Sequence, residues 1–250
     1  MTMVRQFLLA VSFLTRVPIR RLDLSKADFA RATVYFPLVG TLIGAAGAGA
    51  FWLAHLWFSV SISVVLVLAF LMLLTGALHE DGLADAFDAF GSTHSKEEIL
   101  HTMRDSRIGT YAALALIMAM FIKFLAVSQM APRTIALAFV LAHTVSRWAM
   151  LPTLALLPYP RKSAALSKRF VEAVATMPKW HLLAAALYTA AASFLLAGAT
   201  GIVCMGIATV VGLACTWYFW RKIQGATGDC YGTIQQCSEA VLYLAMLKLL

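Results

Sequence analysis

The chain has 250 residues, of which 61% are hydrophobic and only 13% are charged, and its formal net charge is +8. A soluble domain needs a mostly polar surface, so this composition excludes an ordinary soluble globule and predicts an integral membrane protein. The four cysteines show neither CxxC spacing nor the disulfide pattern of a secreted domain. We therefore interpret them as packing residues.

The chain begins with apolar side chains at helical spacing followed by basic residues, which predicts an amphipathic segment at the membrane interface over residues 1–30. Seven apolar stretches follow. The last has only 13 residues, about 20 Å of helix, so we expect six or seven transmembrane helices. The sequence thus predicts an all-α, polytopic membrane helix bundle with short amphipathic cytoplasmic helices, and one integral membrane domain over residues 1–250. The apolar stretches are residues 33–58, 59–78, 109–130, 134–157, 180–197, 202–219 and 238–250.

Small residues mark one side of the first apolar stretch. Gly40 and Gly44 have GxxxG spacing, and without a Cβ atom they allow the backbone of another helix to approach closely. That helix can belong to the same chain or to a second copy. The pattern therefore leaves a homo-oligomer open.

The distribution of charge predicts the orientation. With the N-terminus in the cytoplasm, 16 of the 20 basic residues and all twelve acids fall on the cytoplasmic side. This agrees with the positive-inside rule. The excess basic charge then faces anionic lipid headgroups or an anionic substrate, so we expect membrane lipids and no nucleic acid as partners.

An acidic stretch follows the second apolar run and holds four of the twelve acids. On a helix, at about 100° per residue, Asp81, Asp85 and Asp88 fall within about 60° of one another, with Glu80 to the side. Carboxylates on one face repel, and hard oxygen ligands suit Mg²⁺, so we favour a metal site over a solvated surface. His79 is a candidate general base or orienting group, with a plain interfacial histidine as the alternative.

Two arginines precede the third apolar stretch, at the end of a polar loop over residues 80–108. Ser95 and Glu98 fit a capping box, which predicts a short helix within this loop. Arg104 and Arg107 are candidate phosphate ligands, because guanidinium groups match phosphate oxygens and the following helix N-terminus attracts anions. A positive-inside anchor is the alternative.

A glycine-rich segment precedes the last apolar stretch, with Gly225, Gly228 and Gly232 around Asp229. The glycines predict a backbone nest for an anion or the close approach of a ligand. Asp229 is positioned to complete the metal site from the far end of the chain. An ordinary glycine-rich turn is the alternative, and Gln235, Gln236 and Glu239 are expected to line the same opening.

Two basic residues lie inside predicted spans. Arg147 is expected about 15 Å deep, with His143 one turn away, so it should face the protein interior or a wet cavity. It is a candidate phosphate ligand, with a structural carbonyl partner as the alternative. Lys123 lies nearer the outer end of its span, and we expect it to snorkel to the surface.

Taken together, these motifs resemble the cobalamin synthase family, also called adenosylcobinamide-GDP ribazoletransferases. The resemblance covers nearly the whole chain. Two departures are Arg20, where the family often continues with a proline, and Ala112, where a glycine is common. Neither of these two departures replaces an acidic residue of the motifs. The matching stretches are FLTRVP at 13–18, FPLVG at 36–40 with Ile43 and Gly44, the run from His79 to Asp88, MRDSRIGTY at 103–111, and 225–232 with Glu239.

The resemblance implies a multi-pass enzyme of the bacterial inner membrane that needs Mg²⁺. It implies that adenosylcobinamide-GDP is joined to α-ribazole, or to its 5′-phosphate, with release of GMP. The proton would be taken by a carboxylate such as Asp81 or Asp85, or by His79. The assignment that follows from the resemblance gives Mg²⁺ to Glu80, Asp81, Asp85 and Asp88, and the substrate to Arg104, Arg107, Arg147, Gly228 and Asp229.

Two other functions are weighed against this one. A CDP-alcohol phosphotransferase also places aspartates at a cytoplasmic membrane surface, but here only Asp81-Gly82 and the general spacing of the acids match. A transporter would suit the intramembrane Arg147 and Lys123, yet the sequence shows no internal repeat and no acid expected at the midplane. Substrate-dependent release of GMP distinguishes the enzyme from a carrier.

Overall fold

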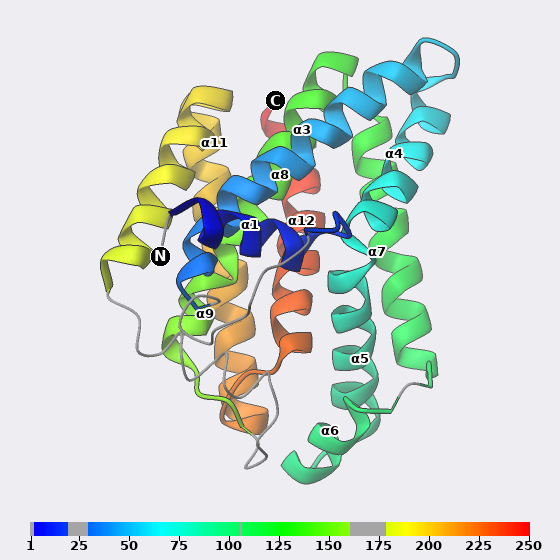
Figure 1. Ribbon diagram of the computed structural model, residues 1–250. Helices are drawn as coiled ribbons and strands as arrows, with labels where there is room; N and C mark the ends of the chain where they lie inside the picture. The colour runs from blue at the N-terminus through cyan, green and yellow to red at the C-terminus, as the bar shows by residue number, and fades with distance from the viewer. Residues whose placement is uncertain (1–2, 20–29, 106, 161–178) are drawn as a thin grey trace.

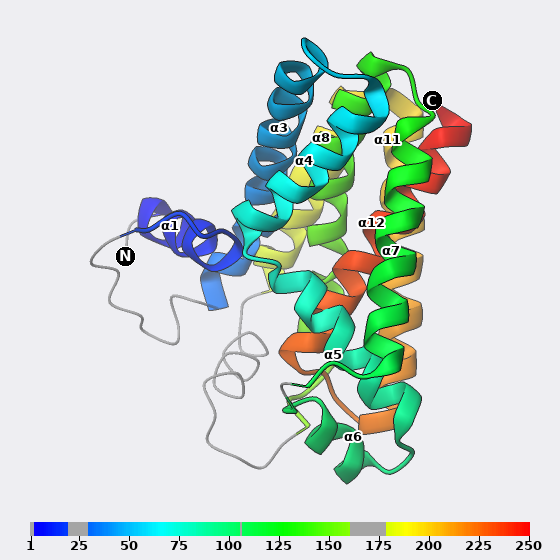
Figure 2. The same ribbon diagram turned by 90° about the vertical axis from the view of Figure 1, so that its right-hand side faces the viewer.

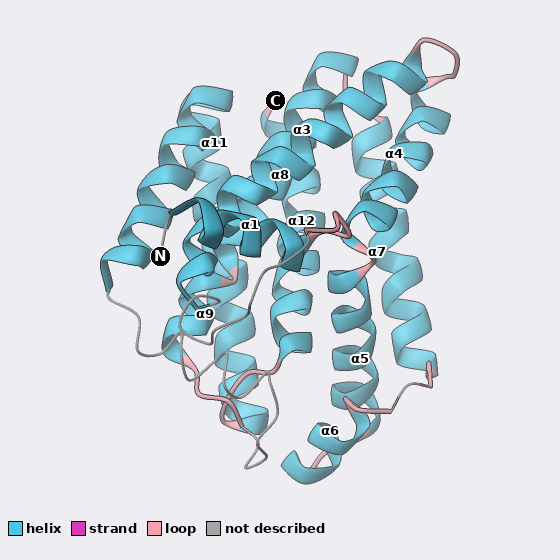
Figure 3. Ribbon diagram, viewed as in Figure 1, coloured by secondary structure: helices cyan, strands magenta, loops and turns pink. Residues whose placement is uncertain are grey.

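The structure is a computed structural model that describes residues 3–19, 30–105, 107–160 and 179–250. In these residues it is built of helices, without a strand (Figures 1 and 3). Most of the predicted basic loop over residues 158–179 lies outside the described residues. The helices are α1 (Met3–Leu14), η1 (Thr33–Tyr35), α3 (Phe36–His55), α4 (Val60–Thr75), α5 (Leu78–Ser92), α6 (Lys96–Thr102), α7 (Thr110–Ser128), α8 (Pro132–Ala149), α9 (Leu151–Leu156), α11 (Lys179–Ile223) and α12 (Gly228–Leu249).

The described helices confirm the prediction of an all-α, polytopic membrane bundle. Four are long and apolar enough to cross a membrane, or five when α4 and α5 count as one broken span. α11 is one of the four, but non-helical torsions at Ala197 and Gly198 divide it into two limbs. Figures 1 and 2 show these limbs running antiparallel, as two separate apolar stretches predicted. α12 has 22 residues, which is about 33 Å of helix and enough in length to cross the hydrocarbon core.

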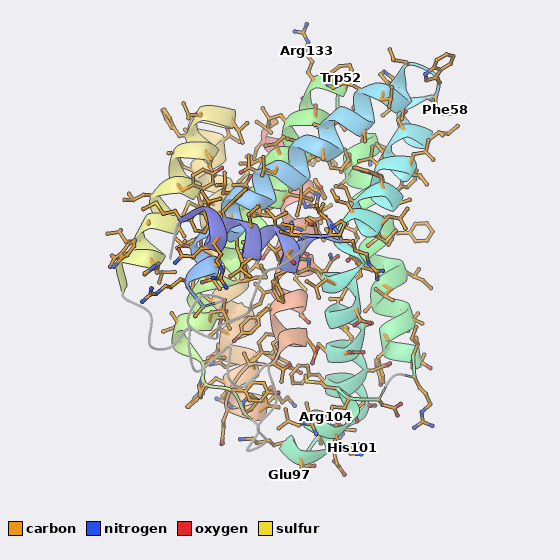
Figure 4. The ribbon with its side chains drawn as sticks, in the orientation of Figure 1. Trp52, Phe58, Glu97, His101, Arg104 and Arg133 are labelled. Carbon is orange, nitrogen blue, oxygen red and sulfur yellow. The ribbon has the colours of Figure 1, made fainter. Side chains whose placement is uncertain are left out.

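The bundle has two chemically different ends. Figure 4 places Trp52, Phe58 and Arg133 at one end, and Glu97, His101 and Arg104 at the other. α5 and α6 run toward the second end (Figure 1), so the acidic stretch and the arginines of the polar loop share one side of the molecule. α1 lies across the bundle axis (Figure 2), as expected of a helix at a membrane interface.

A sharp bend separates α4 from α5. The predicted second span continues to residue 78, but α4 ends at Thr75 and the chain turns by 89° before α5. Gly76 and Ala77 adopt left-handed torsions, with φ of 68° and 55°. The backbone N–H of Arg16 donates to the carbonyl of Leu74 at 2.8 Å, and the Arg16 side chain packs against Gly76. The N-terminal segment therefore braces the bend that redirects the acidic helix.

The GxxxG pair packs within the chain, against α8. A Cβ atom added to Gly44 would lie 2.5 Å from the carbonyl oxygen of Phe139, and one added to Gly40 would collide with the carbonyl oxygen of His143. Both neighbours are backbone atoms of a buried helix, so neither can yield easily. Gly49, on the same helix, has no atom within 4 Å of such a Cβ. The predicted close helix approach is confirmed.

We predict that Gly44→Ala lowers stability while Gly49→Ala does not. The added methyl group at position 44 overpacks a backbone contact, which typically costs about 1–3 kcal/mol. Thermal unfolding of the purified variants in detergent measures the difference. Equal melting temperatures for the two variants would show that α3 does not depend on this contact with α8.

Candidate functional site

The side chains of α5 divide between the interior and the solvent. Asp81 is exposed, Asp85 and Asp88 are half-buried, and His79 is buried with only 4% of its surface accessible. The charge of Asp85 interacts with those of Asp229, Asp81 and Asp88. The predicted carboxylate face is therefore present. His79 lies on the opposite, interior side of the helix, away from the exposed Asp81.

Asp229 reaches this face because α5 and α12 meet at two glycines. A Cβ atom on Gly82 would lie 3.1 Å from both the Cα and the carbonyl oxygen of Asp229, and one on Gly232 would lie 3.0 Å from the carbonyl oxygen of His79. The hydroxyl of Thr227 donates to Asp229 at 3.0 Å. Residues almost 150 positions apart thus bring carboxylates to one surface, as the sequence predicted for Asp229.

Asp88 has a structural partner at the start of α7. Its two carboxylate oxygens accept hydrogen bonds from the backbone N–H groups of Gly109, at 2.5 Å, and of Ala112, at 2.9 Å. These are N–H groups of a helix N-terminus, which have no intrahelical acceptor. Asp88 therefore caps α7 from a neighbouring helix, and each of its carboxylate oxygens has a backbone N–H partner.

The gathered carboxylates fit Mg²⁺ only as a partial ligand set. Among the described residues, no three His, Cys, Asp or Glu side chains stand close enough to hold a metal ion by themselves. Glu80 and Asp88 of the predicted set have other partners, which leaves Asp81 and Asp85 beside Asp229. Mg²⁺ is usually bound by one or two carboxylates together with water and substrate phosphates. The donors present suit that mode, and they do not suit an all-protein cage.

The two arginines of the polar loop lie at the same end of the bundle as these acids. Arg104 is exposed, and the Arg107 side chain is 87% exposed. Arg107 donates to both carboxylate oxygens of Asp105, at 3.0 and 2.6 Å, and this contact lowers the pKa of Asp105 to about 2. Asp105 thus stays ionised across the physiological range and holds Arg107 at the protein surface.

The glycines of the glycine-rich segment do not have the left-handed torsions expected of a backbone nest. Among the described glycines only Gly76 and Gly198 have them, and in this segment the left-handed residue is Gln224, with φ of 54°. Gly225 instead packs on Pro158, whose carbonyl accepts the N–H of Ala226 at 3.0 Å. Gly228 begins α12 and faces open space. This segment therefore leads into α12, whose first turn carries Asp229.

A buried polar cavity lies behind the acidic helix. Lys123 is 1% exposed and forms a 2.8 Å ion pair with Glu239, so the expectation that it snorkels to the surface is wrong. Arg147 is also 1% exposed and donates to His143 Nδ1 at 2.7 Å. It faces the interior as predicted, but among these partners rather than beside the exposed acids. The ionisable side chains lining the cavity are His79, Glu80, Lys123, His143, Arg147 and Glu239.

Three side chains of α12 line this cavity together: Gln235, Gln236 and Glu239. The sequence grouped these residues, but it placed them at the cytoplasmic opening. Glu239 is 3% exposed inside the bundle, and Gln235, one turn before it, donates to its carboxylate. Two glutamines and a glutamate within one turn of a buried helix therefore indicate an interior polar site here.

Comparison with known proteins decides the family. The model of the family described as cobalamin-5-phosphate synthase matches residues 6–247. The chain belongs to this family. It is similar to adenosylcobinamide-GDP ribazoletransferases from Shewanella amazonensis, with 38% identity over 97% of this chain and 95% of the relative, and from Ralstonia nicotianae, with 37% identity over 97% and 95%. The relative from Vibrio parahaemolyticus is 36% identical over 96% of this chain and 91% of its own length. No solved structure matches the chain.

Membership of the cobalamin-5-phosphate synthase family makes the chain a transferase of cobalamin synthesis. A carrier is thereby excluded as its function, although charged residues do lie inside the bundle. The family match extends from α1 to the end of α12, and so includes both the acidic helix and Asp229. The elements that meet at the Gly82 and Gly232 contact are therefore parts of one family unit.

We predict that Asp88→Asn lowers the stability of the protein and that Asp81→Asn does not. The amide keeps one acceptor oxygen but loses one of two bonds to the first turn of α7, a loss of about 1 kcal/mol. At position 81 the change only relieves repulsion with Asp85. Melting temperatures in detergent measure both effects. An unchanged Asp88→Asn protein would mean that the cap is dispensable.

Proposed function

We propose that this chain is an adenosylcobinamide-GDP ribazoletransferase that acts with Mg²⁺ at the membrane surface. A ribose hydroxyl of α-ribazole, or of its 5′-phosphate, attacks the phosphorus that carries the cobinamide. The new P–O bond forms as the pyrophosphate P–O bond to the GMP phosphate breaks, GMP leaves, and the hydroxyl proton passes to a base. The products are adenosylcobalamin, or its 5′-phosphate, and GMP.

One observation carries the proposal beyond family membership. The carboxylate of Asp229, from the end of the chain, meets those of Asp81 and Asp85 through the α5–α12 contact. Carboxylates held near one another repel, and a cation relieves that repulsion. A pyrophosphate substrate brings both the need for such a cation and the additional oxygen ligands. The arrangement therefore supports a metal-assisted attack on a pyrophosphate.

The residues take separate roles in this proposal. Asp81 and Asp85, with Asp229, would hold Mg²⁺, which supplies charge neutralisation at the pyrophosphate when bound. Arg104 lies at the same end of the bundle (Figure 4), and Arg107 lies three residues before the start of α7. Both are exposed to solvent and would contact the non-bridging phosphate oxygens. A carboxylate of this face takes the proton of the attacking hydroxyl. We prefer it to His79 because His79 lines the interior cavity.

We place the active face on the cytoplasmic side of the bacterial inner membrane. This placement is supported by the distribution of charge in the sequence. Most basic residues are expected on the same side as the acidic helix, and cytoplasmic loops are typically rich in Lys and Arg. α1 lies across the bundle with Met3 and Val4 exposed and Leu14 buried, which suits contact with lipid headgroups beside the site. A substrate reaching the acids from the cytoplasm would not have to cross the apolar end.

The test is release of GMP from adenosylcobinamide-GDP and α-ribazole by the purified protein. We expect activity to require Mg²⁺ and to disappear with EDTA. Asp81→Asn and Asp85→Asn should each reduce the rate about 100-fold, because each removes charge that is needed at the transition state. Glu97→Gln is the matched control, since Glu97 is an exposed acid on α6 at the same end of the bundle.

Three results would contradict the proposal. The first is that the unmodified protein, with both substrates and Mg²⁺, forms no GMP. The second is GMP release that persists at limiting Mg²⁺ in folded Asp81→Asn and Asp85→Asn proteins, which would remove these residues from the site. The third is an equal loss of activity in Glu97→Gln, which would show that overall charge matters rather than these carboxylates.

A further inference from the structure

A chain of polar contacts connects the acidic helix to the interior of the bundle. Glu80 Oε1 accepts a hydrogen bond from the side chain of Gln236 on α12, at 2.9 Å. The other end of the Gln236 amide accepts from Lys123 Nζ on α7, at 2.7 Å. Lys123 is in turn paired with Glu239 at 2.8 Å. Three helices therefore meet through one continuous series of side chains, and Glu80 is its end on α5.

The members of this series on α7 and α12 are buried, and Glu80 is half-buried. Gln236 is 2% exposed, and Lys123 and Glu239 are equally inaccessible. The second oxygen of Glu80 is also buried, without a hydrogen-bond partner among the described side chains. Removing two ions from water costs more than their attraction commonly returns, so such a pair is poor evidence of added stability. Its best attested use is to select one arrangement of helices over others.

The arrangement selected here is the rotation of α5. Neighbouring residues on a helix point about 100° apart, so holding Glu80 against α12 leaves Asp81 on a different face. Asp85, one turn further on, follows Asp81. The observed exposures agree, because Glu80 contacts the interior while Asp81 is exposed and Asp85 is half-buried. If α5 turned, Asp81 and Asp85 would move away from Asp229.

We propose that Glu80 is a positioning residue, held by Gln236 and Lys123, that sets the rotation of α5 and so presents Asp81 and Asp85 to Asp229. This inference rests on the proposed function for its kinetic readout. It replaces the role that the sequence suggested for Glu80, which was direct ligation of Mg²⁺. Glu80 acts through the placement of other carboxylates and does not touch the ion.

The experiment combines conservative and truncating variants with a double-mutant cycle. Glu80→Gln keeps an oxygen that can accept from Gln236, so kcat should stay within about threefold of the unmodified protein. Glu80→Ala and Gln236→Ala each break the series, and each should lower kcat about 10- to 100-fold, the range for residues that orient ligands. The double variant should be no worse than either single variant, because both remove the same contact.

Mg²⁺ binding provides a readout that does not depend on turnover. In Glu80→Gln, the Mg²⁺ concentration at half-maximal rate should stay within about twofold, whereas Glu80→Ala and Gln236→Ala should raise it because the carboxylates move apart. The rise in melting temperature on adding Mg²⁺ with GMP should persist in Glu80→Gln, shrink in Glu80→Ala and Gln236→Ala, and disappear in Asp85→Asn. If Glu80→Ala proves unstable, Gln236→Ala and Glu80→Gln make the same comparison.

The inference is overturned if Glu80→Gln loses as much activity as Glu80→Ala and needs more Mg²⁺, since that pattern belongs to a metal ligand. Rate losses that multiply in the double variant would also overturn it, because Glu80 and Gln236 would then act independently. Both results require that the unmodified protein releases GMP. Failure of that control reaction refutes the proposed function instead, so the two failures are distinguishable.

Discussion

The close approach of α5 and α12 at Gly82 and Gly232 is the contact on which the candidate site depends. Helix backbones can come this near only where no Cβ atom intervenes. The consequence is chemical, because the contact places Asp229 beside acids that precede it by almost 150 residues. A larger residue at either glycine would separate the two helices, and the carboxylate face would lose its member from α12.

α5 is shaped by what lies on each of its sides. Its outer face carries exposed and half-buried aspartates, and its inner face carries His79 and Glu80 against a buried polar cavity. Its first end is set by the bend at Gly76 and Ala77, which Arg16 braces. Its far end is tied to α7 because Asp88 caps that helix. The helix therefore has little freedom to rotate or slide, which suits a surface on which a metal and a pyrophosphate must be held in register.

The acids illustrate why spacing alone identifies a face but does not assign a role. Helical periodicity correctly grouped Asp81, Asp85 and Asp88 and set Glu80 apart, because the angle per residue is a local property. What each carboxylate contacts is not local. Asp88 accepts hydrogen bonds at the start of α7, and Glu80 accepts one from Gln236 on α12. Both partners come from other parts of the chain. We therefore propose Asp81 and Asp85 with Asp229 in place of the four-carboxylate metal set predicted from the sequence.

The sequence by itself determined the membrane class, the all-helical bundle, the amphipathic N-terminal segment and the family, because these follow from composition, local periodicity and short motifs. It also located the close glycine packing of α3. Only the tertiary structure decided that Lys123 pairs with Glu239 in the interior, that the second span bends by 89° before the acids, and that the glycines near Asp229 have no left-handed torsions. The reason is physical: whether a charged side chain snorkels or is buried depends on which neighbouring helix offers a partner. That choice is made by packing between distant segments.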